Sequence, residues 1–427
     1  MNTEIRQKAA SADIPLMDYI LKRIGELEKK DGIKRTIFAA CPNSLAVIKA
    51  ALRAAKRWNS PVKFAATLNQ VDTDRGYTAL TQEEFVNCIK KEASHLNLHV
   101  PVIVAVDHGG PWLKDLHTQG KWNFEKSFNA VKKSFEASII AGYDLIHVDP
   151  TVDITLPKGE NISIETVAIR TLDLIGHTEQ FRKTGGYGRI AYEVGTEEVH
   201  GGLADIATFR KFLELLKSGL KERGLAEVWP CFIVGKVGTD LHTTTFDPET
   251  ARILTAIARE YGSVIKGHYS DGVINLEEYP LSGMGAANVG PEFTEKEYAG
   301  LLELEHLEET LFNQGKIVDR SRINLVLRDA VVNSRRWKKW LNPDEDSANF
   351  DLISSERQNW LIGTGCRYIW QNPEVIAARM KLYGNLESKG ILAEEIVLSH
   401  IESAMDKYFA AFNLRNLNDL LQTKLKI

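Results

Sequence analysis

Several apolar runs of this sequence end in histidine and acidic residues, which are the residue types that bind metal ions and move protons. Residues 104–112 read VAVDHGGPW, where small apolar residues lead to Asp107 and His108. A single pair of this kind can simply cap a turn, and that interpretation stays open for this pair alone. Two further runs end in VGTDLH and KGHYSD and contribute His242 and His268. The recurrence favours one shared site.

The runs that end in these residues have the composition of buried β-strands. Runs rich in β-branched and small apolar residues predict eight strands, at 36–41, 62–67, 101–108, 144–149, 189–195, 229–238, 263–269 and 285–290. Segments with helical periodicity separate them, at 44–58, 81–96, 123–141, 163–183, 204–223, 247–262 and 293–308. Near-continuous apolar strands are typical of parallel sheets that are buried on both faces.

Eight strand–helix alternations over about 270 residues predict an α/β fold, a (β/α)8 TIM barrel. A doubly wound open sheet is the alternative, and the even repeat favours the barrel. We expect residues 1–309 to form the barrel that carries the site. The segment 310–427 contains WKKW and long helical patterns, and we expect it to form a helical extension packed on the barrel.

In a barrel of this kind, groups at the carboxyl ends of the strands converge on one rim. Besides Asp107, the strand ends supply four imidazoles: His108, His200, His242 and His268. His147 lies inside the fourth predicted strand, and we expect it to be a core residue with its hydrogen bonds satisfied.

Three or four imidazoles beside carboxylates suit a divalent ion such as Zn²⁺, or Mn²⁺, Co²⁺ or Ni²⁺. Such an ion can polarise a sugar carbonyl, and Asp107 beside it can act as general acid and base. The alternative is a set of hydrogen-bonded polar groups without a metal.

Composition excludes several classes of protein. The net charge of −4 argues against a nucleic-acid partner, and no stretch is apolar enough for a membrane span. The N-terminus lacks the apolar segment of a signal peptide, and four widely spaced cysteines suit a cytoplasmic protein. The sequence contains neither GxxxxGK[ST] nor GxGxxG, so we expect no nucleotide cofactor.

The strand-end motifs VAVDHGGPW, YEVGTEE, VGTDLH, KGHYSD and AANVGPE resemble those of the GatZ/KbaZ family. Its members are class II tagatose-1,6-bisphosphate aldolase subunits that have long been described as non-catalytic. The segment FAATLNQVDTDRGYTALTQEEF, which contains Asn69 and Gln70, and RYIWQNPEV in the C-terminal part are equally similar. The resemblance covers nearly the whole chain.

The resemblance implies roles for individual residues. Class II aldolases place metal-binding histidines after strands three, six and seven, which here are His108, His242 and His268. His200 is not part of this set and is expected as a fourth ligand or a substrate contact. Asp107 matches the proton-transferring aspartate. Glu193, which is similar to the strand-five glutamate, is expected to be catalytic. Substrate-binding positions are expected at Asn69, Gln70, Glu197, Gly201, Ser270, Asp271 and Asn288.

Two departures from the aldolase pattern affect phosphate binding. Thr243 follows His242 where the aldolases have glycine, and Pro291 stands where their strand-eight motif has a threonine. Proline has neither a hydroxyl group nor an N–H. A ketose monophosphate or a free ketose therefore suits the site better than a bisphosphate.

Three functions are compatible with these residues. The first is metal-dependent C4 epimerisation of a ketohexose or its phosphate, between tagatose 6-phosphate and fructose 6-phosphate, by retro-aldol and aldol steps. The second is a non-catalytic subunit that stabilises a KbaY/GatY-type aldolase in a complex. The third is an aldolase that releases triose phosphates. A homo-oligomer is also possible.

Overall fold

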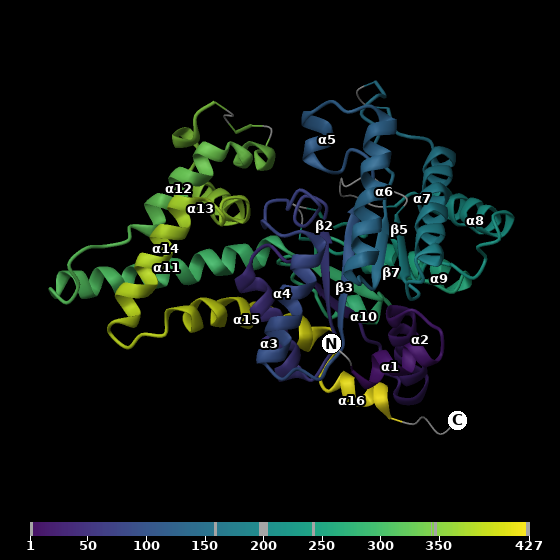
Figure 1. Cartoon of the computed structure of the whole chain (residues 1–427), viewed down its shortest axis with the longest axis horizontal. Coiled ribbons are helices and arrows are strands. Elements are labelled where there is room, and N and C mark those ends of the chain that lie inside the picture. Colours follow the sequence, from purple (N-terminus) through teal and green to yellow (C-terminus); the bar gives the residue numbers. More distant parts are fainter. Residues whose placement is uncertain are drawn as a thin grey trace.

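Eight parallel strands close into a barrel in which neighbours follow chain order and β8 pairs with β1. The structure is a computed structural model, and it describes residues 3–157, 160–195, 204–240, 244–342, 344–345 and 348–423. The strands are β1 (Ile37–Ala40), β2 (Val62–Thr67), β3 (Val102–Gly109), β4 (Leu145–Val148), β5 (Ala191–Gly195), β6 (Phe232–Val234), β7 (Val264–Gly267) and β8 (Ala286–Val289). The predicted TIM barrel is confirmed (Figure 1).

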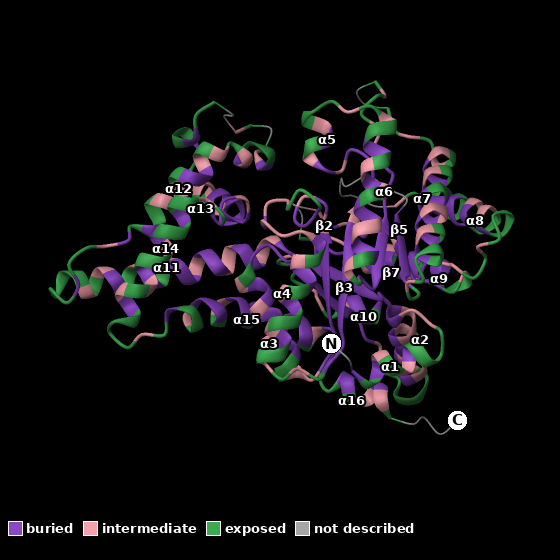
Figure 2. Ribbon diagram, viewed as in Figure 1, coloured by how far each residue is buried: buried purple, intermediate pink, exposed green. Residues whose placement is uncertain are grey.

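Helices separate the strands and cover the barrel. They are α3 (Leu45–Trp58), α4 (Gln82–His95), α5 (Asp115–Gln119), α6 (Phe124–Ala141), α7 (Ile164–Thr184), α8 (Ile206–Glu222), α9 (Pro248–Glu260), α10 (Glu278–Leu281) and α11 (Pro291–Asn313). Figure 2 shows that the strands are buried, whereas the helices between them expose part of their surface. None of the helices in the described ranges combines the length and apolar character that a membrane span needs.

Strand β6 is shorter than the sequence predicts. The expected run was 229–238, but only Phe232–Val234 forms a strand between β5 and β7. Pro230 has no N–H with which to join the ladder. At the other end, the carbonyl of Lys236 accepts a hydrogen bond from the N–H of Ala204, ahead of α8, rather than from a neighbouring strand.

The C-terminal helices begin on the barrel, leave it and return. Helices α12 (Ile323–Ser334), α13 (Ser355–Gly365) and α14 (Pro373–Glu387) pack along α11 to one side of the barrel (Figure 1). Helix α15 (Ala393–Ala411) then packs between α11 and α3. The ring of Phe38 on β1 lies 5.0 Å from that of Phe409 and 5.8 Å from that of Tyr408. These rings attach the extension to the barrel wall.

Two helices that precede the barrel, α1 (Glu4–Ser11) and α2 (Leu16–Asp31), cover its amino-terminal end together with α16 (Leu417–Gln422). The guanidinium of Arg6 donates to the carbonyl of Val102 (2.9 Å) and pairs with Asp144. Asp144 in turn accepts the N–H of Val104 (3.0 Å). One ion pair therefore joins α1 to the starts of two strands.

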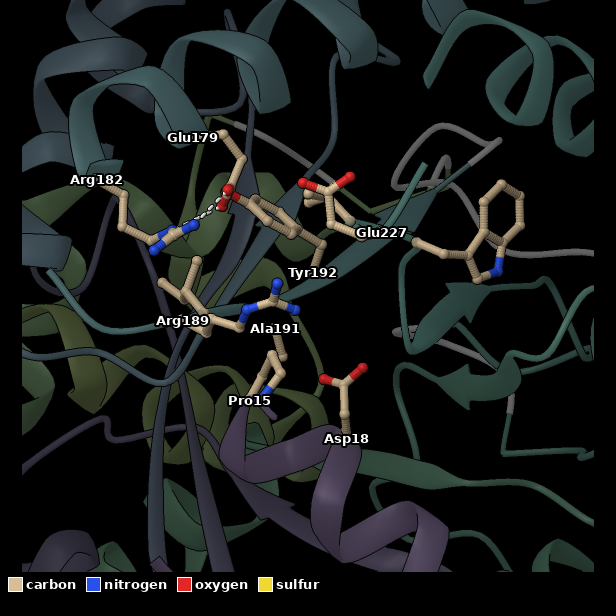
Figure 3. Close-up of a pocket in the computed structure, with 11 residues that line it drawn as sticks. Pro15, Asp18, Glu179, Arg182, Arg189, Ala191, Tyr192 and Glu227 are labelled. Carbon is tan, nitrogen blue, oxygen red and sulfur yellow. Dashed lines mark hydrogen bonds and ion pairs between the residues drawn. The ribbon is translucent and has the colours of Figure 1, made fainter. Parts of the chain in front are cut away.

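A cavity of about 40 Å³ lies at this same end, beside the start of β5. Figure 3 shows Asp18, carried by α2, near the guanidinium of Arg189. The Oδ2 atom of Asp18 is buried and has no hydrogen-bond partner in the described part of the chain. Burial raises the pKa of this carboxyl to about 7, although Arg189 acts in the opposite direction. The ionised form of Asp18 is therefore disfavoured in the folded protein.

We predict that Asp18→Asn stabilises the protein at pH 8 but not at pH 5. Because the folded-state pKa lies above the unfolded value, the folded chain holds a proton between about pH 4 and 7 that the unfolded chain has lost. The free energy of unfolding therefore falls as the pH rises through this window. The uncharged Asn side chain does not titrate, so the variant does not lose this stability. Calorimetry should show a midpoint raised by about 2 °C at pH 8.

Asp13→Asn is the control for this prediction, since Asp13 is largely exposed and contacts the same Arg189. If Asp18→Asn changed the unfolding midpoint equally at pH 5 and pH 8, the raised pKa of Asp18 would be contradicted.

Candidate active site

Asp107 and His108 end β3 in an unusual backbone geometry. His108 adopts a left-handed conformation with φ 47°, and the pairing of β3 with β4 is irregular between Val106 and Gly109. A Cβ atom at Gly110 would lie 1.7 Å from the carbonyl oxygen of Asp149. Only glycine allows this approach, which brings the end of β4 against the end of β3.

The carboxylate of Asp107 is buried and contacts side chains from β4, β7 and β8, with His147 Nδ1 on β4 at 3.4 Å from its Oδ1. Its Oδ1 accepts a hydrogen bond from Lys266 Nζ (2.9 Å) and lies 3.2 Å from His268 Nε2. Its Oδ2 accepts a hydrogen bond from Asn288 Nδ2 (2.9 Å). Residues predicted at the ends of β3, β7 and β8 therefore meet at one carboxylate.

Glu193 on β5 lies beneath this carboxylate between two buried lysines. Its Oε1 is 2.5 Å from Lys266 Nζ, and its Oε2 is 3.0 Å from Lys63 Nζ on β2. All three side chains are inaccessible to solvent. Lys63 was not predicted as a site residue, although a lysine inside an apolar strand such as VKFAAT signals a buried charge that needs a partner.

The two lysines determine the ionisation of the acids. Burial alone would raise the pKa of Asp107, but Lys266, His108 and His268 outweigh it and hold that pKa well below its usual value. Lys266 and Lys63 likewise outweigh burial and lower the pKa of Glu193. Both acids are therefore carboxylates at neutral pH.

The imidazole rings form a layer above these charges. The ring centroids of His108 and His268 are 4.3 Å apart. His108 Nδ1 lies 2.6 Å from Asp149 Oδ2, and Asp149 is fixed by the hydroxyl of Thr151 (2.6 Å). Burial, followed by the charges of Lys266 and His108, lowers the pKa of His268 to about 3. The ring of His268 is therefore neutral at pH 7, as a metal-binding imidazole must be.

His147 on β4 joins the same layer, where the sequence predicted only a satisfied core residue. It is fully buried, and its Nδ1 accepts the N–H of His108 (3.1 Å) and lies 3.2 Å from Glu193 Oε1. Its Nε2 is buried without a hydrogen-bond partner in the described chain. The sequence did contain a signal, because the two-residue period of a strand puts His147 on the same face as Asp149.

These donors suit a divalent ion. Ligand atoms lie within 4.8 Å of one another in two groups, Asp107 with His147, Glu193 and His268, and His108 with His147 and Asp149. A carboxylate that holds one imidazole nitrogen and leaves the other free, as Asp149 does for His108, is typical of metal-binding histidines. His147 belongs to both groups of possible ligands. Glu193 is the least available donor, because both lysines already bind it.

Two predicted substrate contacts, Asn69 and Gln70, form hydrogen bonds that hold loops. Asn69 donates to the carbonyl of Leu113 (3.0 Å) and accepts the N–H of Asp115 (2.8 Å). Gln70 is buried, and its side chain accepts the N–H of Thr67 (2.7 Å) and donates to Asn43 (2.7 Å). Both side chains are therefore used in holding the loop after β2.

Some of the other predicted site residues lie in the described structure and some do not. The hydroxyl of Ser270 is fully buried and has no hydrogen-bond partner among the described residues, and Asp271 follows it after β7. The predicted ligands His200 and His242, and the predicted substrate contacts Glu197 and Gly201, lie outside the residues that the structure describes.

Comparison with solved structures supports the fold. A probable tagatose 6 phosphate kinase from Sinorhizobium meliloti 1021 is 21% identical, with a TM-score of 0.69 over 88% of this chain and 100% of its own. A fructose-bisphosphate aldolase from Campylobacter jejuni is 14% identical, with a TM-score of 0.54 over 94% of this chain and 95% of its own. These identities are low, so the likeness establishes the fold alone.

The family is established by a match that runs along almost the entire sequence. The model of the D-tagatose-1,6-bisphosphate aldolase subunit GatZ/KbaZ-like family matches residues 21–424. This range includes the whole barrel, each strand end described above and the C-terminal helices through α16. The chain is therefore a member of the GatZ/KbaZ-like family of D-tagatose-1,6-bisphosphate aldolase subunits.

Proposed function

We propose that this protein catalyses C4 epimerisation of a ketohexose or its phosphate, such as tagatose 6-phosphate to fructose 6-phosphate, by metal-dependent retro-aldol and aldol steps. The observation that carries the proposal is the meeting of Asp107 with His108 and His268 at the carboxyl ends of β3 and β7. Membership of an aldolase-related family supports the same type of chemistry.

The ion, Zn²⁺ or else Mn²⁺, Co²⁺ or Ni²⁺, would be bound by His108 and His268, whose rings face each other at 4.3 Å. His242 remains the predicted third ligand, and His147 is a further candidate because it belongs to both groups of possible ligands. When bound, the ion would supply positive charge that polarises the sugar carbonyl.

Asp107 would move the proton of the C4 hydroxyl. As the C3–C4 bond breaks, the carboxylate accepts this proton, which leaves an aldehyde and an enediolate. The aldehyde turns over, the bond reforms on its other face, and Asp107 returns the proton. Because Lys266 and the imidazoles hold the pKa of Asp107 low, the carboxylate starts the cycle ionised. Asn288, bonded to the same carboxylate, fixes its orientation.

A non-catalytic subunit is the second candidate, and the lysines are the observation in its favour. Lys63 and Lys266 neutralise Glu193 and Asp107 without any ion, so the buried charges are balanced by the chain itself. In this case the protein would stabilise a KbaY/GatY-type aldolase. An aldolase that releases triose phosphates is the third candidate, and it would use the same residues as the epimerase.

We predict that purified protein loaded with Zn²⁺ retains one equivalent and that His268→Ala lowers its affinity at least about tenfold, because an imidazole ligand is lost. Mass spectrometry of metal content after dialysis measures both. His95→Ala is the control, since the side chain of His95 is exposed on α4. A wild-type protein without bound metal, or equal affinity in both variants, would rule out the proposed ligands.

We also predict that Asp107→Asn lowers kcat for interconversion of the two ketose 6-phosphates by about 10²–10⁴, because the amide cannot accept the proton. Nuclear magnetic resonance follows both sugars directly. Asp173→Asn, which changes an exposed carboxylate on α7, should leave the rate unchanged.

The products distinguish the three functions. Epimerisation requires that one ketose phosphate replaces the other without accumulation of trioses. Release of triose phosphates would assign the aldolase function. Absence of turnover, together with recovery of activity in a co-purified KbaY/GatY-type aldolase, would assign the subunit function.

A further inference from the structure

The loops after β7 and β8, with the start of the next helix, are the usual place for a phosphate group in a (β/α)8 barrel. Backbone N–H groups at the beginning of a helix bind such an anion because they have no partner within the helix. In this chain the helix is α11, which begins at Pro291 directly after β8.

Asp271 already occupies this position. Its Oδ1 accepts the N–H of Gly290 (2.9 Å) and the N–H of Glu292 (2.8 Å). Pro291 between them has no N–H, and the N–H of Phe293 bonds to the carbonyl of Gly290 (3.0 Å). The start of α11 therefore has no donor left for a phosphate.

The surrounding charges also oppose a phosphate. Glu292 accepts the N–H of Gly272 (3.0 Å) and pairs with the hydroxyl of Tyr408, which holds its carboxylate beside Asp271. Burial raises the pKa of Asp271 to about 6, and the nearby charge of Glu292 adds to this increase. Burial raises the pKa of Glu295, one turn further along α11, to about 7, and Asp271 adds to it.

Arg367 is the cation that offsets these acids from the C-terminal helices. It is buried and lies over the rings of Trp340 (4.7 Å) and Tyr368 (5.0 Å), and it forms no ion pair with the described residues. Arg367 lowers the pKa of Glu295 but does not overcome burial and the neighbouring carboxylates. Arg367 also lowers the pKa of Asp271, but burial outweighs it there as well.

The groups on the barrel side of Asp271 are neutral. Within the part of the chain that the structure describes, the hydroxyl of Ser270 and the Oδ1 of Asn288 are both buried without hydrogen-bond partners. The N–H of Ser270 bonds to the carbonyl of Asn288 (3.1 Å). Asn288 also contacts Asp107, so this surface is continuous with the proposed reaction centre. Neutral donors and acceptors of this kind suit a sugar hydroxyl.

We propose that Asp271 is a specificity-determining residue that reserves the β7–β8 end of the site for an unphosphorylated end of the sugar. This rests on the proposed function. The substrate is a free ketose, or a ketose monophosphate whose phosphate lies away from this end, and ketose bisphosphates are excluded. The carboxylate takes the helix N–H groups that a phosphate would need, and its charge repels the dianion.

Inorganic phosphate tests the proposal without any need for catalysis. Asp271→Ser removes the charge and releases two N–H groups, so calorimetric titration should show phosphate binding at least about tenfold tighter than in the wild type. Asp271→Asn removes the charge but keeps a hydrogen-bond acceptor, so its increase in phosphate affinity should be smaller. Asp205→Asn, which changes the carboxylate that caps α8, should bind phosphate no better than the wild type.

Equal phosphate affinity in the wild type and Asp271→Ser would overturn the proposal. So would tight wild-type binding that Arg367→Met abolishes, because the phosphate would then use the guanidinium. In the active enzyme, the kcat/KM for a ketose bisphosphate relative to a monophosphate should rise about tenfold in Asp271→Ser. If no variant turns over any ketose, the proposed function fails, and the phosphate titration still decides the role of Asp271.

Discussion

The buried contact of Lys266 with Asp107 and Glu193 is the interaction on which the rest of the site depends. Two carboxylates in the interior of a barrel would be strongly unfavourable, and Lys266 together with Lys63 balances them. The four side chains come from β2, β3, β5 and β7, so the network connects strands that are distant in sequence. Loss of one partner would leave an uncompensated buried charge, which costs about 3–5 kcal/mol.

The imidazole layer takes its orientation from this network. Asp107, fixed by Lys266 and Asn288, contacts His268, while Asp149 fixes the ring of His108 from the other side. Gly110 makes this second contact possible, because it lets the end of β4 approach β3. The lysines balance the buried carboxylates, and the carboxylates orient the imidazole rings. A reaction that passes through an anionic intermediate requires such preorganised groups.

Much of this arrangement could be predicted from the sequence. The carboxyl ends of parallel strands share one rim, so Asp107, His108, His268 and Asn288 could be expected to meet from strand positions alone. The position of His147 in the site was missed because both faces of a barrel strand are buried. A histidine within such a strand is easily interpreted as a core residue. The sequence also does not show which strands face each other across the barrel. The contact of Lys63 on β2 with Glu193 on β5 could therefore not be predicted.

Other differences arise from hydrogen bonds that exist only in the folded chain. The amide of Asn69, a predicted substrate contact, bonds to the backbone of Leu113 and Asp115, which the sequence did not indicate. At the ends of β7 and β8, folding brings the carboxylate of Asp271 onto the N–H groups of Gly290 and Glu292. The spacing of the sequence places polar residues at the rim of the barrel. Which of them form hydrogen bonds with each other depends on the geometry of the loops.

The central claim, that a divalent ion binds between the imidazoles above the buried lysine network, is tested most directly by anomalous diffraction from crystals of the Zn²⁺-loaded protein. Data collected on both sides of the zinc edge locate the ion without reference to activity. The account predicts one strong peak about 2.1 Å from nitrogens of His108 and His268. A map without a peak there, or with zinc only at surface histidines, would contradict it.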